Sequence, residues 1–465
     1  MLGSSLFAQA IPLLSLPILT RLFPAESFGV LALLLSVAAA LAVLSTLRFD
    51  LAMVLPDLEE EAVDIAGLTC LTTIVVALLT IIIGVGGLEV LQPSSVGISS
   101  AVGLSLVVAM TILIAVQQVS IAFATRRKNF PGIAATGVIS HSTNLFVAVV
   151  SGLFSPTLTA LAEARAFGQL AASGNLVRQE RTAWSQISLQ RSALRARELL
   201  KRYRPFILFN APYSLVGSLM RDIPLYTLLT LHSASTAGLY GIARTVTFAP
   251  ALLGSAAFSQ VFFRYALENR ASLEFSAQIK RWLRLGLVAS APAFAIAAAW
   301  GEEIFSLVFG QAWAESGSMA ASLAIAAWWS LQTSWPERIF EVQGKQVVSF
   351  TIQSVGDLIT AFGFILLVWS DARLTTSIAL LALGQSLTYQ IYTAYVARLS
   401  GLNRSAVVAL AIQGWACFGF FYVVYKVAGE ALESSEWAMA LSCVVAVAGA
   451  VLLLKLETRF ASRRS

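Results

Sequence analysis

Six ionisable side chains interrupt long apolar stretches of this sequence, and they are the residues best placed to do chemistry. They are Glu163, Arg165, Arg221, Asp222, Arg244 and Asp357. An ionised side chain at the middle of a membrane helix costs about 2.5–3.5 kcal/mol on insertion scales. Such residues are therefore expected to face a bundle interior or a wet cavity, where substrates and ions bind.

The three arginines of this set share a depth. Each lies about eight or nine residues in from the outer end of its predicted span, which is ~13 Å at 1.5 Å per residue. A guanidinium fork matches phosphate oxygens bidentately, so this shared level predicts binding of a phosphate group. The alternative is an internal salt-bridge set, because Glu163 and Asp222 lie at nearly the same depth and would cancel two of the three charges.

Uncharged polar residues extend the pattern at helical spacing. Three stripes result: Asn210, Ser214, Gly217 and Arg221; Tyr240, Arg244 and Thr247; Gln353, Asp357 and Thr360. We expect Asn210 and Tyr240 to bind substrate together with the arginines. Asp357 has no adjacent basic residue and is the preferred proton or sodium coupling group, with Glu163 and Asp222 as further candidates. The alternative role of such stripes is hydrogen bonding between helices, worth ~0.6 kcal/mol per bond.

Metal and nucleotide chemistry are not indicated. The three cysteines lie inside apolar runs without close spacing, and the only histidines, His141 and His232, have no HExxH motif or Cys/His partner nearby. No GxxxxGK[ST] motif occurs, so the chain itself is not expected to hydrolyse ATP. We expect no metal, no cofactor and no catalytic residue, and hence a protein that is not an enzyme.

The composition indicates a membrane protein. Apolar residues make up 57% of the 465 residues, charged residues only 12%, and the mean hydropathy is +0.78, whereas soluble domains carry about 25% charged residues. The net charge is +6, but the basic residues lie in short segments between apolar runs, where they would meet anionic headgroups. A nucleic-acid partner is therefore not expected. The N-terminus is apolar without a basic n-region, which predicts a retained first span.

A bilayer core of ~30 Å requires about 20 apolar residues in a helix. On this basis the sequence predicts fourteen spans, near residues 4–22, 28–48, 63–86, 98–122, 131–152, 156–177, 205–230, 236–261, 283–307, 317–336, 346–370, 374–397, 405–426 and 437–454. Lipid offers no hydrogen-bond partners, and apolar runs of this length are not the short alternating segments of a barrel. The predicted fold class is therefore an all-α polytopic membrane protein.

The distribution of basic residues orients these spans. With a cytoplasmic N-terminus, 25 of the 31 Lys and Arg residues fall in inner segments, and only Arg21, Arg373 and Lys426 fall in outer ones. Since Lys and Arg collect on the cytoplasmic side, both termini are predicted to be cytoplasmic. One inner segment, residues 56–64, is acidic, although acidic residues carry little weight in this rule.

Two turns suggest that the halves of the chain are related. LTRLFPAESFGVLALL (residues 19–34) and LTLHSASTAGLYGIAR (residues 229–244) share a Leu-Thr start, a short polar turn and a glycine, at an offset of about 210 residues. Spans one and seven each contain two prolines, Pro12 with Pro17 and Pro212 with Pro224. Interrupted spans at corresponding positions point to a transporter's central site. The alternative is that prolines are simply commoner in membrane helices.

These features predict four segments. Residues 1–177 form an N-terminal six-helix lobe, 178–204 a basic cytoplasmic linker, 205–397 a C-terminal six-helix lobe, and 398–465 two additional helices with a basic tail. The linker interleaves apolar residues with arginine, as surface-lying helices do. It is expected either to anchor the topology or to gather anionic lipid-linked cargo.

Four passages carry a family resemblance: LPILTRLFPAESFGVLAL (residues 16–33), RFDLAMVLP (48–56), GLYGIARTVTFAPALLGSAAFSQVFFRYA (238–266) and VFGQAW (308–313). In this order they resemble the polysaccharide-unit flippases of the Wzx type, which belong to the multidrug/oligosaccharidyl-lipid/polysaccharide exporter superfamily. The resemblance implies two six-helix lobes around a central cavity and two extra C-terminal helices. It supplies no catalytic residues, and the residue assignments above rest only on depth and spacing.

The resemblance further implies a flippase that moves undecaprenyl-diphosphate-linked oligosaccharide units for O-antigen, capsule or exopolysaccharide assembly by alternating access. The expected partners are the lipid-linked sugar, membrane lipids, and a polysaccharide polymerase or other assembly proteins, at the bacterial cytoplasmic membrane. Two alternatives stay open within the superfamily: a drug or toxin exporter and a peptidoglycan-precursor flippase. An alternative of another class is a membrane polymerase or glycosyltransferase, although the first predicted outer loop offers only Glu26 as an acid.

Overall fold

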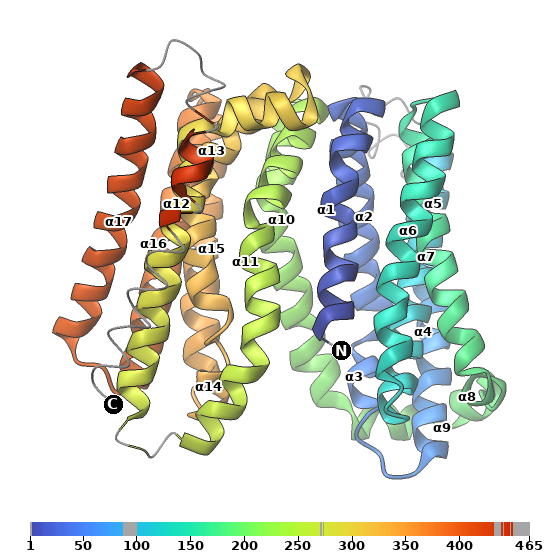
Figure 1. Cartoon of the computed structure of the whole chain (residues 1–465). Helices are drawn as coiled ribbons and strands as arrows, with labels where there is room; N and C mark the ends of the chain where they lie inside the picture. Colours follow the sequence, from blue (N-terminus) through green and yellow to red (C-terminus); the bar gives the residue numbers. More distant parts are fainter. Residues whose placement is uncertain are drawn as a thin grey trace. The chain divides into compact units, whose positions relative to one another are not determined.

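The computed structural model describes residues 2–86, 100–269, 272, 274–431, 439, 441–446 and 448–449. Within these ranges the chain is helical and contains no strand, so the predicted all-α class is confirmed (Figure 1). The long helices are α1 (Leu2–Leu22), α2 (Ala25–Thr46), α4 (Glu59–Gly86), α5 (Ser100–Arg126), α6 (Phe130–Phe154), α7 (Leu158–Gln179), α10 (Ala211–Leu231), α11 (Ala234–Asn269), α12 (Phe275–Phe309), α13 (Ala314–Ser334), α15 (Gln346–Trp369), α16 (Leu374–Leu399) and α17 (Arg404–Ala431).

These thirteen described helices match the first thirteen predicted spans one for one. Half of the last predicted span, residues 437–454, lies outside the described residues, and its described residues, 439, 441–446 and 448–449, are helical. Seven of the described helices are apolar and long enough to cross a membrane by composition and length alone. Helices α7, α10 and α11 are not among them, and these three carry five of the six candidate charges.

Short elements connect the long helices. They are α3 (Phe49–Ala52), α8 (Arg181–Ser185), α9 (Leu189–Arg202), α14 (Ile339–Val342), the π-helical turn η1 (Phe206–Asn210) and the 3-10 turn η2 (Gln311–Trp313). Prolines do not end α1, which contains Pro12 and Pro17 within one helix. Span seven begins as the π-helical turn and continues as α10, with Pro212 in the first turn and Pro224 inside.

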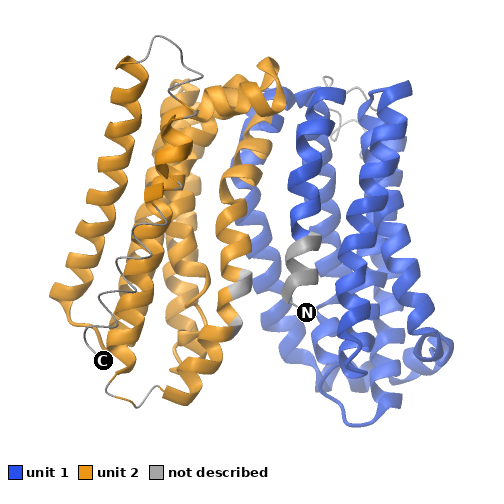
Figure 2. Cartoon of the chain, viewed as in Figure 1, with its two compact units in different colours: residues 1–238 blue, residues 239–465 orange. Residues whose placement is uncertain are grey.

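The described chain forms two compact units, residues 1–238 and 239–465 (Figure 2). Unit 1 contains α1 to α10 and the first residues of α11. In unit 1, α2 packs against α4, α5, α7 and α10. The second unit holds the rest of α11 and the helices that follow it. The predicted division into residues 1–177, 178–204, 205–397 and 398–465 stays a prediction.

The two related turns meet through equivalent glycines in unit 1. A Cβ on Gly29 of α2 would overlap the carbonyl oxygen of Ala234, and a Cβ on Gly238 would overlap the carbonyl oxygen of Ala25. The contact is reciprocal, because Gly29 and Gly238 are as far apart in the sequence as Ala25 and Ala234. Small residues allow membrane helices to approach at backbone distance, so this crossing requires glycine in both turns.

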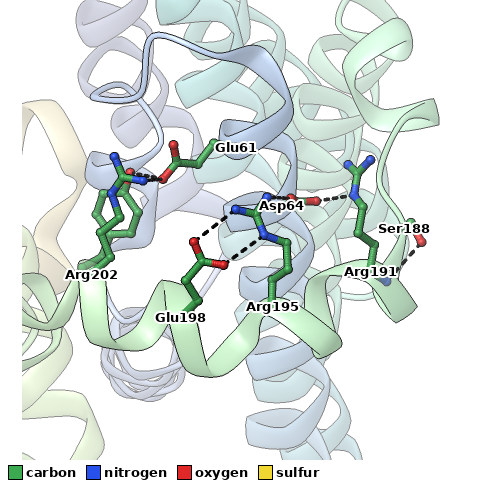
Figure 3. A network of polar contacts seen from close by, with 8 residues as sticks. Glu61, Asp64, Ser188, Arg191, Arg195, Glu198 and Arg202 are labelled. Carbon is green, nitrogen blue, oxygen red and sulfur yellow. Dashed lines mark hydrogen bonds and ion pairs between the residues drawn. The ribbon is translucent and has the colours of Figure 1, made fainter.

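The basic linker lies against the acidic start of α4 (Figure 3). The carboxylate of Asp64, only 1% exposed, accepts hydrogen bonds from Arg191 Nε and Arg195 Nη1, each at 2.5 Å. Both arginines lie on one face of α9, whose N-terminal turn is capped by the Ser188 hydroxyl. Gly67 makes room for this contact, since a Cβ there would overlap Ser192 of α9.

Further acids of the same segment are paired as well. Glu61 Oε1 lies 2.8 Å from Arg202 Nη1 and accepts a hydrogen bond of 2.9 Å from the Tyr203 hydroxyl. Burial, together with this bond to Glu61, raises the pKa of Tyr203 above its ordinary value. Glu59 lies 2.6 Å from Arg127 Nη2. Three of the five acids in the segment 56–64 are thus paired with arginines of the linker and of the loop after α5.

In unit 2 the core is aromatic. Trp328 of α13 donates Nε1 to the Leu287 carbonyl at 3.1 Å and packs against Phe418 of α17. Helix α12 is kinked at Trp300, which has non-helical φ/ψ angles of −126° and 23°. Lys426 of α17 donates to the Ala299 carbonyl at the kink at 2.8 Å, so a side chain supplies a partner where the helical backbone is interrupted.

We expect Gly29→Leu to destabilise the protein, because its side chain would overlap backbone rather than a movable side chain. Overpacking of this kind costs about 1–3 kcal/mol. The matched control is Gly174→Leu on α7, where a Cβ meets nothing within 4 Å. The apparent melting temperature in detergent should fall for Gly29→Leu and stay equal or rise for the control. Equal melting temperatures for the two variants would contradict the close crossing.

The linker contact generates a second prediction. Asp64→Asn leaves two arginines without their carboxylate, and hydrogen bonds to charged groups are worth about 1.5–3 kcal/mol. We expect faster tryptic cleavage within α9 of the folded protein, measured by the appearance of the two half-chain fragments. The exposed Glu60, which has no ion pair among the described residues, provides the control Glu60→Gln. Unchanged cleavage of the Asp64 variant would show that the ion pairs do not hold the linker.

Candidate functional site

Arg165 is half-buried on α7, which packs against α6. The helices cross closely one turn further along α7, where a Cβ on Gly168 would come within 2.5 Å of the Ser140 carbonyl oxygen. His141 of α6 lies within electrostatic range of the Arg165 guanidinium. No carboxylate of a described residue lies within 4.0 Å of Arg165. The guanidinium is therefore not neutralised by an ion pair in the described chain.

Three other candidates of unit 1 are at least partly accessible. Arg221 of α10 and Glu163 of α7 are exposed, and Asn210 at the end of the π-helical turn is half-buried. Neither Arg221 nor Glu163 forms an ion pair with a described residue. A salt bridge between Glu163 and an arginine, one of the alternatives for this set, is thus absent from the described residues. Ionised groups exposed within a span require water or a polar ligand beside them.

Asp222 has a different environment from the neighbouring Arg221. The Ser36 hydroxyl of α2 donates a hydrogen bond to Asp222 Oδ2, and the Tyr226 hydroxyl lies against the same serine. This cluster joins α2 to α10 in unit 1. The sequence did not single out Ser36 as a partner of Asp222, because its neighbours in the middle of α2 are apolar.

Sequence reasoning also missed a polar layer between α5 and α7. Gln169 of α7 donates a hydrogen bond to Gln117 of α5, and Ser173 donates to the Leu113 carbonyl at 3.2 Å. Gln169 is buried and lies one helical turn from Arg165, so polar groups line successive turns of α7. The spacing of Arg165, Gln169 and Ser173 by four residues was the signal that could have identified this stripe.

Three candidates belong to unit 2. Tyr240 and Arg244 lie one turn apart on α11, Tyr240 buried and Arg244 half-buried. Asp357 is exposed on α15. Beside it, Gln353 bonds to Glu337, which lies outside the spans, and burial raises the pKa of the Glu337 carboxyl. The binding roles of Arg165, Arg221, Arg244, Asn210 and Tyr240, and the coupling roles of Asp357, Glu163 and Asp222, stay predictions.

The sequence matches a family model described as "Polysaccharide biosynthesis protein" over residues 18–318, which is more than half of the chain. The chain belongs to this family. The description of this family agrees with the resemblance to polysaccharide-unit flippases that the four sequence passages carry. The curated proteins contain no match to this sequence.

Solved structures show the fold of this polysaccharide biosynthesis family member. A structure described as lipid II flippase MurJ in an inward closed conformation matches with a TM-score of 0.73 and 9% identity over 98% of both chains. An inward-facing multidrug resistance MATE transporter of the MOP superfamily matches with a TM-score of 0.65 and 14% identity, over 87% of this chain and 96% of that one. The chain therefore has the polytopic fold of this superfamily.

Proposed function

We propose that this protein is a flippase that moves undecaprenyl-diphosphate-linked oligosaccharide units across the bacterial cytoplasmic membrane by alternating access. The observation that carries the proposal is Arg165, a half-buried guanidinium within a span that has no carboxylate partner among the described residues. Keeping such a charge in a span is costly unless an anion or water accompanies it. A diphosphate is an anion whose oxygens suit the guanidinium fork.

The family supports a lipid-linked sugar as cargo. Its description names polysaccharide biosynthesis, and an oligosaccharide unit on a polyprenyl diphosphate is a cargo that fits this description. The fold is shared with a protein described as a lipid II flippase. In the proposed mechanism the arginines hold the diphosphate, polar residues such as Asn210 and Tyr240 hold the sugars, and the lipid tail stays in the membrane.

The same proposal covers loading of the cargo, the energy source and release on the outer side. Both termini and the linker lie in the cytoplasm, where the lipid-linked unit is loaded, and the two lobes alternately open to the two sides. An ion gradient supplies the energy through Asp357, assisted by Glu163 or Asp222. A polysaccharide polymerase or another assembly protein receives the unit on the outer side. The product is O-antigen, capsule or exopolysaccharide.

The full-length likeness to MurJ favours a second candidate, a peptidoglycan-precursor flippase. Rescue of a strain depleted of its own lipid II flippase would support this candidate, whereas rescue only of a polysaccharide export mutant would support the first. Drug resistance on overproduction would instead indicate an exporter of the MATE type.

We expect Arg165→Gln to reduce polysaccharide export about ten- to hundred-fold, because a charge-assisted hydrogen bond is worth about 1.5–3 kcal/mol. Arg165→Lys should retain part of the activity, since it keeps the charge but loses the fork. Export is measured as surface polysaccharide in a complemented deletion strain, normalised to the amount of protein in the membrane. The control is Arg373→Gln at the exposed start of α16. Full export by Arg165→Gln at normal protein levels would exclude the phosphate-binding role.

Coupling is tested with Asp357→Asn. In proteoliposomes, an imposed proton or sodium gradient should accelerate translocation of a fluorescent polyprenyl-diphosphate glycan by the wild type and leave the variant unaffected. The reason is that the amide cannot take up and release a proton or hold sodium by charge. Asp371→Asn, beyond the end of α15, is the control and should respond as the wild type does. A gradient response of the Asp357 variant equal to that of the wild type would assign coupling to another residue.

A further inference from the structure

Unit 1 contains an apolar slot between α4 and α5. It has a volume of about 360 Å³, and the lining residues used below are Thr69, Thr73, Ala77, Ile112, Ala115 and Trp184. Trp184 of α8 closes one end of the slot, which we call its linker end. On the other side of the Trp184 ring, Phe123 of α5 packs edge to face with a centroid distance of 6.3 Å.

No side-chain nitrogen or oxygen in the described wall of the slot is free to bond a ligand, and the thiol of Cys70 is only a weak donor. The hydroxyls of Thr69 and Thr73 donate to the carbonyls of Ile65 and Thr69 on their own helix, at 2.9 and 2.7 Å. Trp184 Nε1 donates to the Ser120 hydroxyl at 3.2 Å. Each threonine therefore presents its methyl group and the tryptophan its ring. A ligand with hydrogen-bonding groups would be desolvated here without compensation, so the suitable occupant is hydrocarbon.

The length of the slot matches one leaflet. Its lining runs along α4 from Thr69 to Ile81, which corresponds to about 18 Å at 1.5 Å per residue. Half the hydrocarbon core of a bilayer is about 15 Å. Beyond Ile81 the helices close, because Gly84 of α4 lies directly against the Leu104 side chain of α5. A polyprenyl chain, which is much longer, would not fit within these ends, whereas one acyl chain would.

The linker end is positively charged. Residues 178–204 contain eight basic and two acidic side chains, and α4 acids pair only with Arg191, Arg195 and Arg202 of this segment. Arg181, in the same short helix as Trp184, is exposed and has no carboxylate partner among the described residues. Arg191 uses Nε for Asp64 and keeps 43% of its side chain exposed. A positively charged linker end favours binding of an anionic lipid headgroup.

We propose that this slot binds one acyl chain of an anionic glycerophospholipid, with the phosphate of the lipid against Arg181 and Arg191 at the linker end. The proposal does not depend on the transported cargo. The ion pairs of Asp64 fix α9 onto α4, and the bound lipid, through Arg181 and Arg191, would hold both α8 and α9 there. An anionic lipid therefore stabilises the linker in its observed place.

The probe is a phosphatidylglycerol, with phosphatidylethanolamine as the zwitterionic comparison, added to the full-length protein in detergent and followed by native mass spectrometry. The wild type is expected to retain one phosphatidylglycerol in preference to phosphatidylethanolamine. Ala77→Phe, which fills the slot, should lower this occupancy about tenfold, whereas Leu79→Phe, half exposed on the same helix and not part of the lining, should not change it. Arg181→Gln should reduce the preference for phosphatidylglycerol at least threefold.

A second measurement needs no variant. A phosphatidylglycerol carrying a photoreactive group in its acyl chain is crosslinked to the wild-type protein, and the adducts are mapped by peptide mass spectrometry. Adducts concentrated in residues 69–81 and 108–119 support the proposal. Adducts spread evenly over the apolar helices, or equal occupancy in Ala77→Phe and Leu79→Phe, would overturn it. Displacement of the lipid by equimolar polyprenyl phosphate would overturn it too, because the slot would then hold the tail of the cargo.

Discussion

Hydrocarbon gives a polypeptide no hydrogen-bond partner, so the backbone and the charged side chains of this chain must be satisfied by the protein itself or by a bound ligand or water. The described spans meet this constraint because they are helices, in which the backbone bonds to itself. At the kink of α12 beside Trp300, the ammonium of Lys426 donates a hydrogen bond to the Ala299 carbonyl. At the membrane boundary the acids of α4 are paired with arginines of the linker. The linker is thus an integral part of unit 1 rather than a loose connection.

Where the spans pack together, small residues decide the distance. Gly29 and Gly238 occupy equivalent positions of the two related turns and meet each other's helix at backbone distance. Reciprocal contacts of this kind are what a pseudo-twofold repeat would produce, and the relation between the two halves stays a prediction. The same crossing places α10, with Arg221 and Asp222, beside α2 in unit 1.

The candidate residues differ in how they are accommodated, and this difference bears on function. Asp222 is held by Ser36, whereas Arg165 has His141 within electrostatic range and no carboxylate of a described residue within 4.0 Å. A group whose charge is already satisfied within the protein is suited to a structural or coupling role. A cation without an anionic partner is suited to bind one from outside. This contrast, more than depth in the membrane, makes Arg165 the first residue to test.

The sequence alone determined the all-α class and thirteen described spans, because about twenty apolar residues in succession have no other stable structure in lipid. The family followed from short motifs in order. Only the tertiary structure decided that the acidic segment 56–64 pairs with the linker, that Gly29 meets Gly238, and that Asp222 bonds to Ser36. These pairings join residues far apart in the chain. Local periodicity indicates which face of a helix is polar, but not which helix it will meet.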